Sequence, residues 1–90
     1  MALLIENQQN VFYIKGVIDE SNSEILKLYM MVQFTNHSII TIDISNVSRI
    51  DRHGVNALTS LYQNALKREK DFKIVGYGCK DIYDEFLLSA

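Results

Sequence analysis

The amino-acid sequence predicts an α/β fold in which helices pack on a small mixed β-sheet. The main observation is that short runs rich in β-branched and aromatic residues alternate with longer segments whose apolar residues recur at helical spacing. The second is the length of 90 residues without a proline, which suits one small hydrophobic core and not two. Strands that alternate with helices favour right-handed crossovers and a layered α/β arrangement.

The first half of the chain predicts a β-hairpin followed by a helix. Residues 11–18 form a strand, and residues 3–5 form its short neighbour across a polar turn at 6–10. Ser21 and Glu24 have the spacing of a capping box, which marks a helix start. The apolar residues that then recur at helical spacing are Ile25, Leu28, Tyr29 and Val32.

The second half predicts two further strands and two further helices. Residues 39–44 are a nearly continuous β-branched run, as expected of a central strand. A helix follows over about 52–70, then a strand over 72–77 and a short helix over 81–88. The apolar residues assigned to one side of the second helix are Val55, Leu58, Tyr62, Ala65 and Leu66.

Composition and charge disfavour several classes of protein. A formal net charge of −2 provides no basic surface for nucleic acid. Cys79 is the only cysteine, which excludes an internal disulfide and a thiolate zinc cluster and fits a reducing compartment. The apolar start at 1–5 is too short for a signal peptide, and no stretch is long enough to span a membrane. We therefore expect a cytoplasmic protein that does not insert directly into membranes.

The segment 43–55 carries most of the functional information. It runs Asp-Ile-Ser-Asn-Val-Ser-Arg-Ile-Asp-Arg-His-Gly-Val, which we interpret as a strand end, a short polar turn and an Asp-x-x-Gly step into a helix. A helix amino terminus presents unpaired N–H groups and a partial positive charge, so it favours anions. Gly54 either allows close approach of the backbone to a neighbour or only eases the turn.

This segment resembles the signature of STAS domains, the fold of bacterial anti-sigma factor antagonists. In that signature a strand ending Asp-Leu-Ser leads to Ile-Asp-Ser-Ser-Gly at a helix start. Residues 16–19, Gly-Val-Ile-Asp, resemble the family's Gly-x-Leu-Asp step before its first helix, and the order of elements is similar too. The resemblance implies a single STAS-like domain over residues 1–90. Family members usually add a strand and a helix after the third helix, so the chain is either naturally short or truncated.

The resemblance places the family's phosphoacceptor serine at Arg52, followed by His53. Arginine cannot accept a phosphate from a serine kinase, so the family's usual switch is expected to be absent. Three interpretations stay open: a drifted turn that binds its partner constitutively, an Arg52 fork that binds a carboxylate or phosphate, and a pH-sensitive or metal-binding role for His53. In the second interpretation Asn46, Ser48 and Asp51 shape the turn.

The residues expected to face a partner are Asp19, Asn46, Ser48, Asp51, Arg52, His53 and Gly54. We expect no catalytic residues, metal or cofactor, because the four glycines never cluster as a phosphate loop requires, and Cys79 and the histidines have no diagnostic spacing.

Two functions fit the resemblance. The first is an anti-sigma factor antagonist-like module whose partner is an anti-sigma factor with a serine-kinase fold. The second is the soluble STAS subunit of a bacterial lipid-transport ABC system, which holds the ABC ATPase, because residues 42–51 resemble those subunits equally well. A homodimer through Phe86, Leu87 and Leu88 also stays open.

Overall fold

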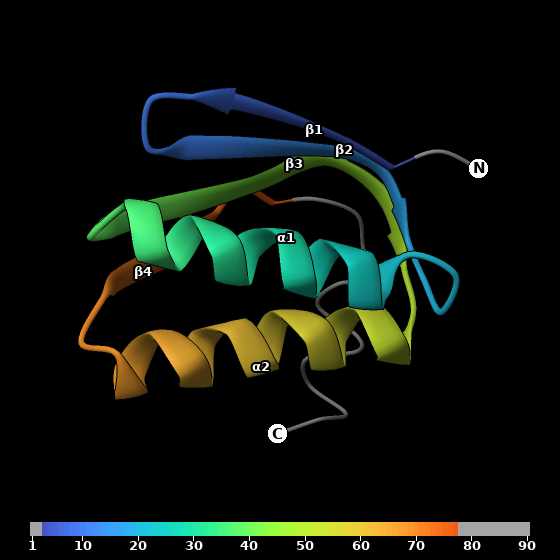
Figure 1. Cartoon of the computed structure of the whole chain (residues 1–90). Coiled ribbons are helices and arrows are strands. Elements are labelled where there is room, and N and C mark those ends of the chain that lie inside the picture. Colours follow the sequence, from blue (N-terminus) through green and yellow to red (C-terminus); the bar gives the residue numbers. More distant parts are fainter. Residues whose placement is uncertain (1–2, 78–90) are drawn as a thin grey trace.

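A computed structural model describes residues 3–77. It has one four-stranded mixed sheet with two helices against one face (Figure 1). The elements are β1 (Leu3–Gln8), β2 (Val11–Ile18), α1 (Ser23–Asn36), β3 (Ile39–Ile50), α2 (Arg52–Lys67) and β4 (Asp71–Val75). The α/β class and the mixed sheet are confirmed. The predicted helix at 81–88, with Phe86, Leu87 and Leu88, lies outside the described residues.

The strands lie in the order β1-β2-β3-β4. The hairpin pair β1-β2 is antiparallel, whereas β2-β3 and β3-β4 are parallel and connected through α1 and α2. The predicted central position of the 39–44 strand is therefore confirmed. The predicted turn at 6–10 is wrong, because residues 6–8 continue β1 and only Gln9 and Asn10 form the turn. These polar residues suit an edge strand, which exposes much of its surface to water.

The hydrophobic core lies between the sheet and the helices. Phe34 of α1 meets Phe72 of β4 edge to face, with ring centroids 5.7 Å apart. The buried cluster comprises Phe12, Ile14, Ile18, Leu26, Met30, Phe34, Ile40, Ile42, Ile44, Val47, Ile50, Val55, Leu58, Leu61, Ala65 and Phe72.

Helix α1 is apolar on both its inner and its outer side. Leu26, Met30 and Phe34 are buried against the sheet. The residues whose spacing predicted the helix lie instead on the exposed side: Ile25, Leu28, Tyr29 and Val32. The helix is confirmed, but the periodicity did not identify its core face, because two apolar stripes share one helix.

Helix α2 is confirmed and ends at Lys67, three residues before the predicted end. Val55, Leu58 and Ala65 are buried as a helical stripe requires. Tyr62 and Leu66, assigned to the same side, are half exposed.

Strand β3 is much longer than the sequence predicts. It does not end in a polar turn after residue 44 but stays paired with β2 as far as Ile50. Two β-bulges each add one residue to β3, so its last buried side chains, Ile44, Val47 and Ile50, are three residues apart. That spacing is not the alternation typical of a strand, which explains why the segment looks like a turn. The first bulge lies between the pairs Tyr13–Asp43 and Lys15–Asn46. The second lies between the pairs Gly16–Val47 and Val17–Arg49.

Candidate functional site

Asp51 connects the two sequence motifs at the amino terminus of α2. One carboxylate oxygen, Oδ1, accepts a hydrogen bond from the backbone N–H of Gly54 at 3.0 Å, which caps the helix. The other, Oδ2, accepts from the backbone N–H of Glu20 at 3.1 Å. The N–H of Asp51 itself donates to the carbonyl of Ile18 at 3.1 Å. The loop after β2 and the start of α2 are therefore held together through one residue.

Gly54 sets how closely α2 approaches the strand ends. A Cβ at this position would lie 2.5 Å from Cγ1 of Ile50, 2.8 Å from Cγ2 of Ile18 and 2.9 Å from the Ile18 carbonyl oxygen. Of the two interpretations of Gly54, the structure supports close approach. Gly54 is buried, so its contribution to a binding surface is indirect.

The loop between β2 and α1 is organised by Asp19 and Asn22. Oδ1 of Asp19 accepts from the hydroxyl of Ser21 at 2.5 Å and from its N–H at 3.0 Å. The hydroxyl bond is the main reason that the pKa of Asp19 is lowered from its ordinary value. The amide of Asn22 donates to the carbonyl of Val17 at 2.9 Å and accepts from the N–H of Asp19 at 3.0 Å.

The predicted capping box of Ser21 and Glu24 does not form. Helix α1 begins after Asn22, whose side chain makes no capping bond to the helix. The Ser21 hydroxyl is bonded to Asp19 instead. Ser21 and Glu24 therefore have the right spacing for a box, but Ser21 stands one residue before the cap position.

Arg52 and His53 are the first two residues of α2, and both are exposed. Nε2 of His53 lies 3.2 Å from Oε2 of Glu20, so a protonated His53 would form an exposed ion pair across to the β2–α1 loop. Within residues 3–77, the side chain of Arg52 makes no ion pair or hydrogen bond.

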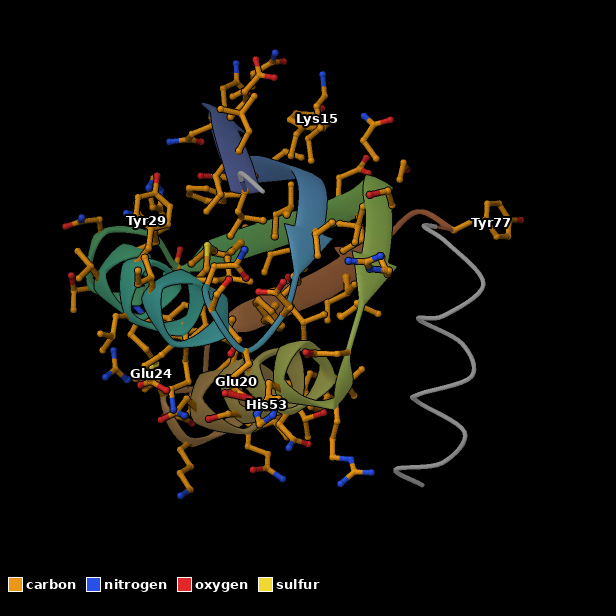
Figure 2. All side chains as sticks on the ribbon, turned by 90° about the vertical axis from the view of Figure 1, so that its right-hand side faces the viewer. Lys15, Glu20, Glu24, Tyr29, His53 and Tyr77 are labelled. Atoms are coloured by element: carbon orange, nitrogen blue, oxygen red, sulfur yellow. The ribbon has the colours of Figure 1, made fainter. Side chains whose placement is uncertain are left out.

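A groove of about 170 Å³ lies beside His53, between the amino-terminal ends of the two helices. Figure 2 shows Glu20, Glu24 and His53 gathered at this end of the molecule. The groove is lined by Ser23, Glu24, Lys27, His53, Asn56 and Ala57. Apart from His53, sequence reasoning missed these residues, because a polar residue on a helix surface carries no signal of which neighbouring helix it faces.

The remaining predicted site residues are not all part of this surface. The hydroxyl of Ser48 donates to the carbonyl of Gly16 at 3.2 Å, which ties β3 to β2. Asn46 pairs with Lys15 in the sheet and lines a different hollow with it. Figure 2 shows Lys15 on the opposite side of the molecule from His53. The structure thus brings together Asp19, Asp51, Arg52, His53 and Gly54, and it separates Asn46 from them.

Among residues 3–77, no three His, Cys, Asp or Glu side chains are grouped as a metal ion would require. No helix in this described part is both long and apolar enough to cross a membrane.

The sequence model of the STAS domain matches residues 2–82, so the chain belongs to the STAS domain family. The fold is similar to that of an anti-sigma factor antagonist from Mycobacterium paratuberculosis, with a TM-score of 0.75 and 21% identity over 98% of this chain and 76% of that one. It is also similar to the unphosphorylated anti-sigma factor antagonist SpoIIAA, with a TM-score of 0.74 and 16% identity over 98% of this chain and 80% of that one.

A third solved structure, of Mglu, matches with a TM-score of 0.67 and 14% identity over 82% of this chain, which spans only 19% of that protein. No curated protein is significantly similar to the chain in sequence. At these identities the structural likeness establishes the fold. The predicted STAS fold and its resemblance to anti-sigma factor antagonists are therefore confirmed.

Proposed function

We propose that the chain is a cytoplasmic protein-interaction module that docks on a regulatory protein through the start of α2. This docking surface consists of Asp19, Glu20, Arg52 and His53 with the adjoining groove. The observation that carries the proposal is Arg52, an exposed guanidinium without a partner in the described part of the chain. It stands on a backbone that Asp51 fixes through its hydrogen bonds with Ile18, Glu20 and Gly54. A rigid donor fork of this kind suits a carboxylate or phosphate on a partner.

The partner that best fits the fold is an anti-sigma factor with a serine-kinase fold. We assign Arg52 to the position of the family's phosphoacceptor serine, on the strength of the Ile-Asp-Arg-His-Gly segment at the helix start. Such a kinase would then bind the chain without phosphorylating residue 52 or 53. The whole chain of 90 residues is proposed to act as one STAS domain with no catalytic activity of its own.

The docking surface is tested by reversing charge at one end of α2 and not at the other. Arg52→Glu should weaken binding to the partner kinase at least tenfold, which corresponds to about 1.4 kcal/mol. Lys67→Glu removes a comparable charge in the last turn of the same helix and should leave affinity within about twofold. Equal affinities for the wild-type protein and Arg52→Glu, measured by calorimetry, would refute the proposed surface.

The missing switch is tested separately. The wild-type protein and Arg52→Ser are each incubated with the kinase and ATP and then examined by mass spectrometry. The wild-type protein should carry no phosphate in the 46–54 segment, whereas Arg52→Ser regains a hydroxyl at a helix amino terminus, where a phosphate is stabilised. Phosphate in that segment of the wild-type protein would contradict the prediction.

A second candidate function is the soluble STAS subunit of a bacterial lipid-transport ABC system. It is favoured by the segment 42–51, Ile-Asp-Ile-Ser-Asn-Val-Ser-Arg-Ile-Asp, which resembles those subunits. The same docking surface would then bind an ABC ATPase. Neighbouring genes distinguish the two candidates: kinase and sigma-factor genes favour the first, permease and ATPase genes the second. Copurification with an ABC ATPase that is lost in Arg52→Glu would establish the second.

A further inference from the structure

The outward side of α1 is an apolar surface that the described part of the fold does not cover. Four large side chains lie on it, at i, i+3, i+4 and i+7: Ile25 is 67% exposed, Leu28 58%, Tyr29 38% and Val32 57%. We call these four residues the α1 stripe. Figure 2 shows Tyr29 and Glu24 bordering the side of α1 that faces away from both the sheet and α2. Soluble proteins rarely expose large contiguous apolar patches unless the patch is an interaction site.

The stripe is symmetric about its own midpoint. The centre lies between Leu28 and Tyr29, and the β-branched residues Ile25 and Val32 stand at equal distances on either side. In a two-fold contact each residue i meets residue j of the other copy, and j meets i. Two antiparallel α1 helices would therefore pack Ile25 on Val32 and Leu28 on Tyr29, each contact occurring twice.

The charges beside the stripe permit this contact. Within α1, Glu24 and Lys27 are paired with each other at 3.6 Å, and the stripe itself is uncharged. The antiparallel arrangement places Glu24 opposite Gln33, so no like charges meet. A parallel arrangement would instead bring Glu24 towards Glu24 and Lys27 towards Lys27, which is repulsive.

We propose that the α1 stripe is a homodimer interface in which two α1 helices pack antiparallel across a two-fold axis. The occupant is a second copy of this chain, because a copy supplies the same short, neutral and symmetric stripe. A stable interface buries about 800 Å² on each partner, more than four half-exposed side chains can supply. The stripe would therefore be the apolar centre of a small interface with a polar rim, and the dimer is expected to be weak and reversible.

This inference does not depend on the proposed docking function. None of the four stripe residues is among the residues of the docking surface or lines its groove, so Leu28→Glu and Arg52→Glu alter separate contacts. Loss of dimerisation would leave partner binding through Arg52 intact, and the reverse also holds.

The dimer is tested by sedimentation equilibrium from low micromolar to several hundred micromolar protein. The wild-type chain should show a reversible monomer–dimer equilibrium, and Leu28→Glu should raise the dimer Kd at least tenfold. Leu66→Glu is the matched control, because Leu66 is 59% exposed on α2, outside the stripe. This control should dimerise as the wild-type chain does. Thermal melts of both variants show whether they remain folded.

The antiparallel arrangement is tested by cysteine cross-linking in a Cys79→Ser background. A mixture of Ile25→Cys and Val32→Cys chains should form mixed disulfide dimers under mild oxidation, whereas neither chain alone should cross-link efficiently. A wild-type chain that stays monomeric throughout, dimerisation unaffected by Leu28→Glu, or efficient self-cross-linking of either cysteine variant would overturn the proposal. A monomeric chain whose binding to a different protein is lost in Leu28→Glu would assign the stripe to that protein and equally overturn it.

Discussion

Replacement of Gly54 by alanine tests whether close packing at the start of α2 holds the site in place. The added Cβ would lie 2.5 Å from Cγ1 of Ile50 and 2.9 Å from the carbonyl oxygen of Ile18. The side chain can move, but the backbone oxygen belongs to a paired strand and cannot move easily. Overpacking costs about 1–3 kcal/mol, and contacts this short place the cost in the upper part of that range, at about 2–3 kcal/mol. Alanine returns about 1 kcal/mol of helix propensity.

The expected net loss for Gly54→Ala is therefore about 1–2 kcal/mol of unfolding free energy. For a domain of this size that lowers Tm by roughly 5–15 °C. Urea unfolding monitored by circular dichroism supplies the free energy, and a thermal scan supplies Tm. Thr59→Ala, at an exposed position of the same helix, should change stability by less than about 0.5 kcal/mol. A Gly54→Ala protein as stable as the wild type would refute the packing argument.

Three further predictions concern the same end of the molecule. Asp51→Ala removes the cap of α2 and the bond to Glu20, so it should lower the unfolding free energy by about 1–2 kcal/mol in urea, and Asp51→Asn, which keeps one acceptor oxygen, should lose less. Ser21→Ala should raise the pKa of Asp19 towards its ordinary value of 3.8 in a carboxyl NMR titration. The pKa of Asp19 is lower in the folded protein than in the unfolded chain, so the ionised carboxylate stabilises the fold above the ordinary pKa. That stabilisation is lost as the pH falls through the folded-state pKa. The wild-type protein and Ser21→Ala should therefore converge in stability in acid. Arg52→Ser should alter the unfolding free energy by only a few tenths of a kcal/mol, and a large fall in Tm would show that Arg52 is structural.

The sequence predicted elements well where the apolar pattern follows one regular period. Strand β2 was predicted with its observed limits from its run of β-branched and aromatic residues, and in the structure its buried residues Phe12 and Ile14 alternate with more exposed ones. The predicted end of β3 was wrong because the bulges space the buried residues Ile44, Val47 and Ile50 three residues apart. Bulges arise from pairing between two strands, so no single strand's sequence shows them.

The prediction of which face of α1 packs on the core was wrong for a different reason. Leu26, Met30 and Phe34 form one apolar stripe, and a second stripe begins at Ile25 on the opposite side. A sequence pattern shows that both exist but not which one the sheet covers. The exposed stripe is informative, because packing within the described part of the chain gives no reason for four large apolar side chains there.

The site was predictable as far as it depends on local sequence. Asp51 and Gly54, three residues apart, marked the helix start correctly. The bond from Glu20 to Asp51 joins residues 31 positions apart, and it depends on β2 and β3 ending at the same level of the sheet. No local motif contains that information, so Glu20 was missed.

The bonding around Asp51 also predicts that a substitution of residue 52 leaves the fold unchanged. Both carboxylate oxygens and the N–H of Asp51 are used internally, and Gly54 fixes the distance to the strands. None of these contacts involves the side chain at position 52, which is exposed at the first position of α2. The helix start is therefore expected to keep its shape whether that side chain is a hydroxyl or a guanidinium. In the proposed function, this independence lets the chain retain its docking surface while the usual phosphorylation switch is absent, and the near-neutral stability expected of Arg52→Ser tests it directly.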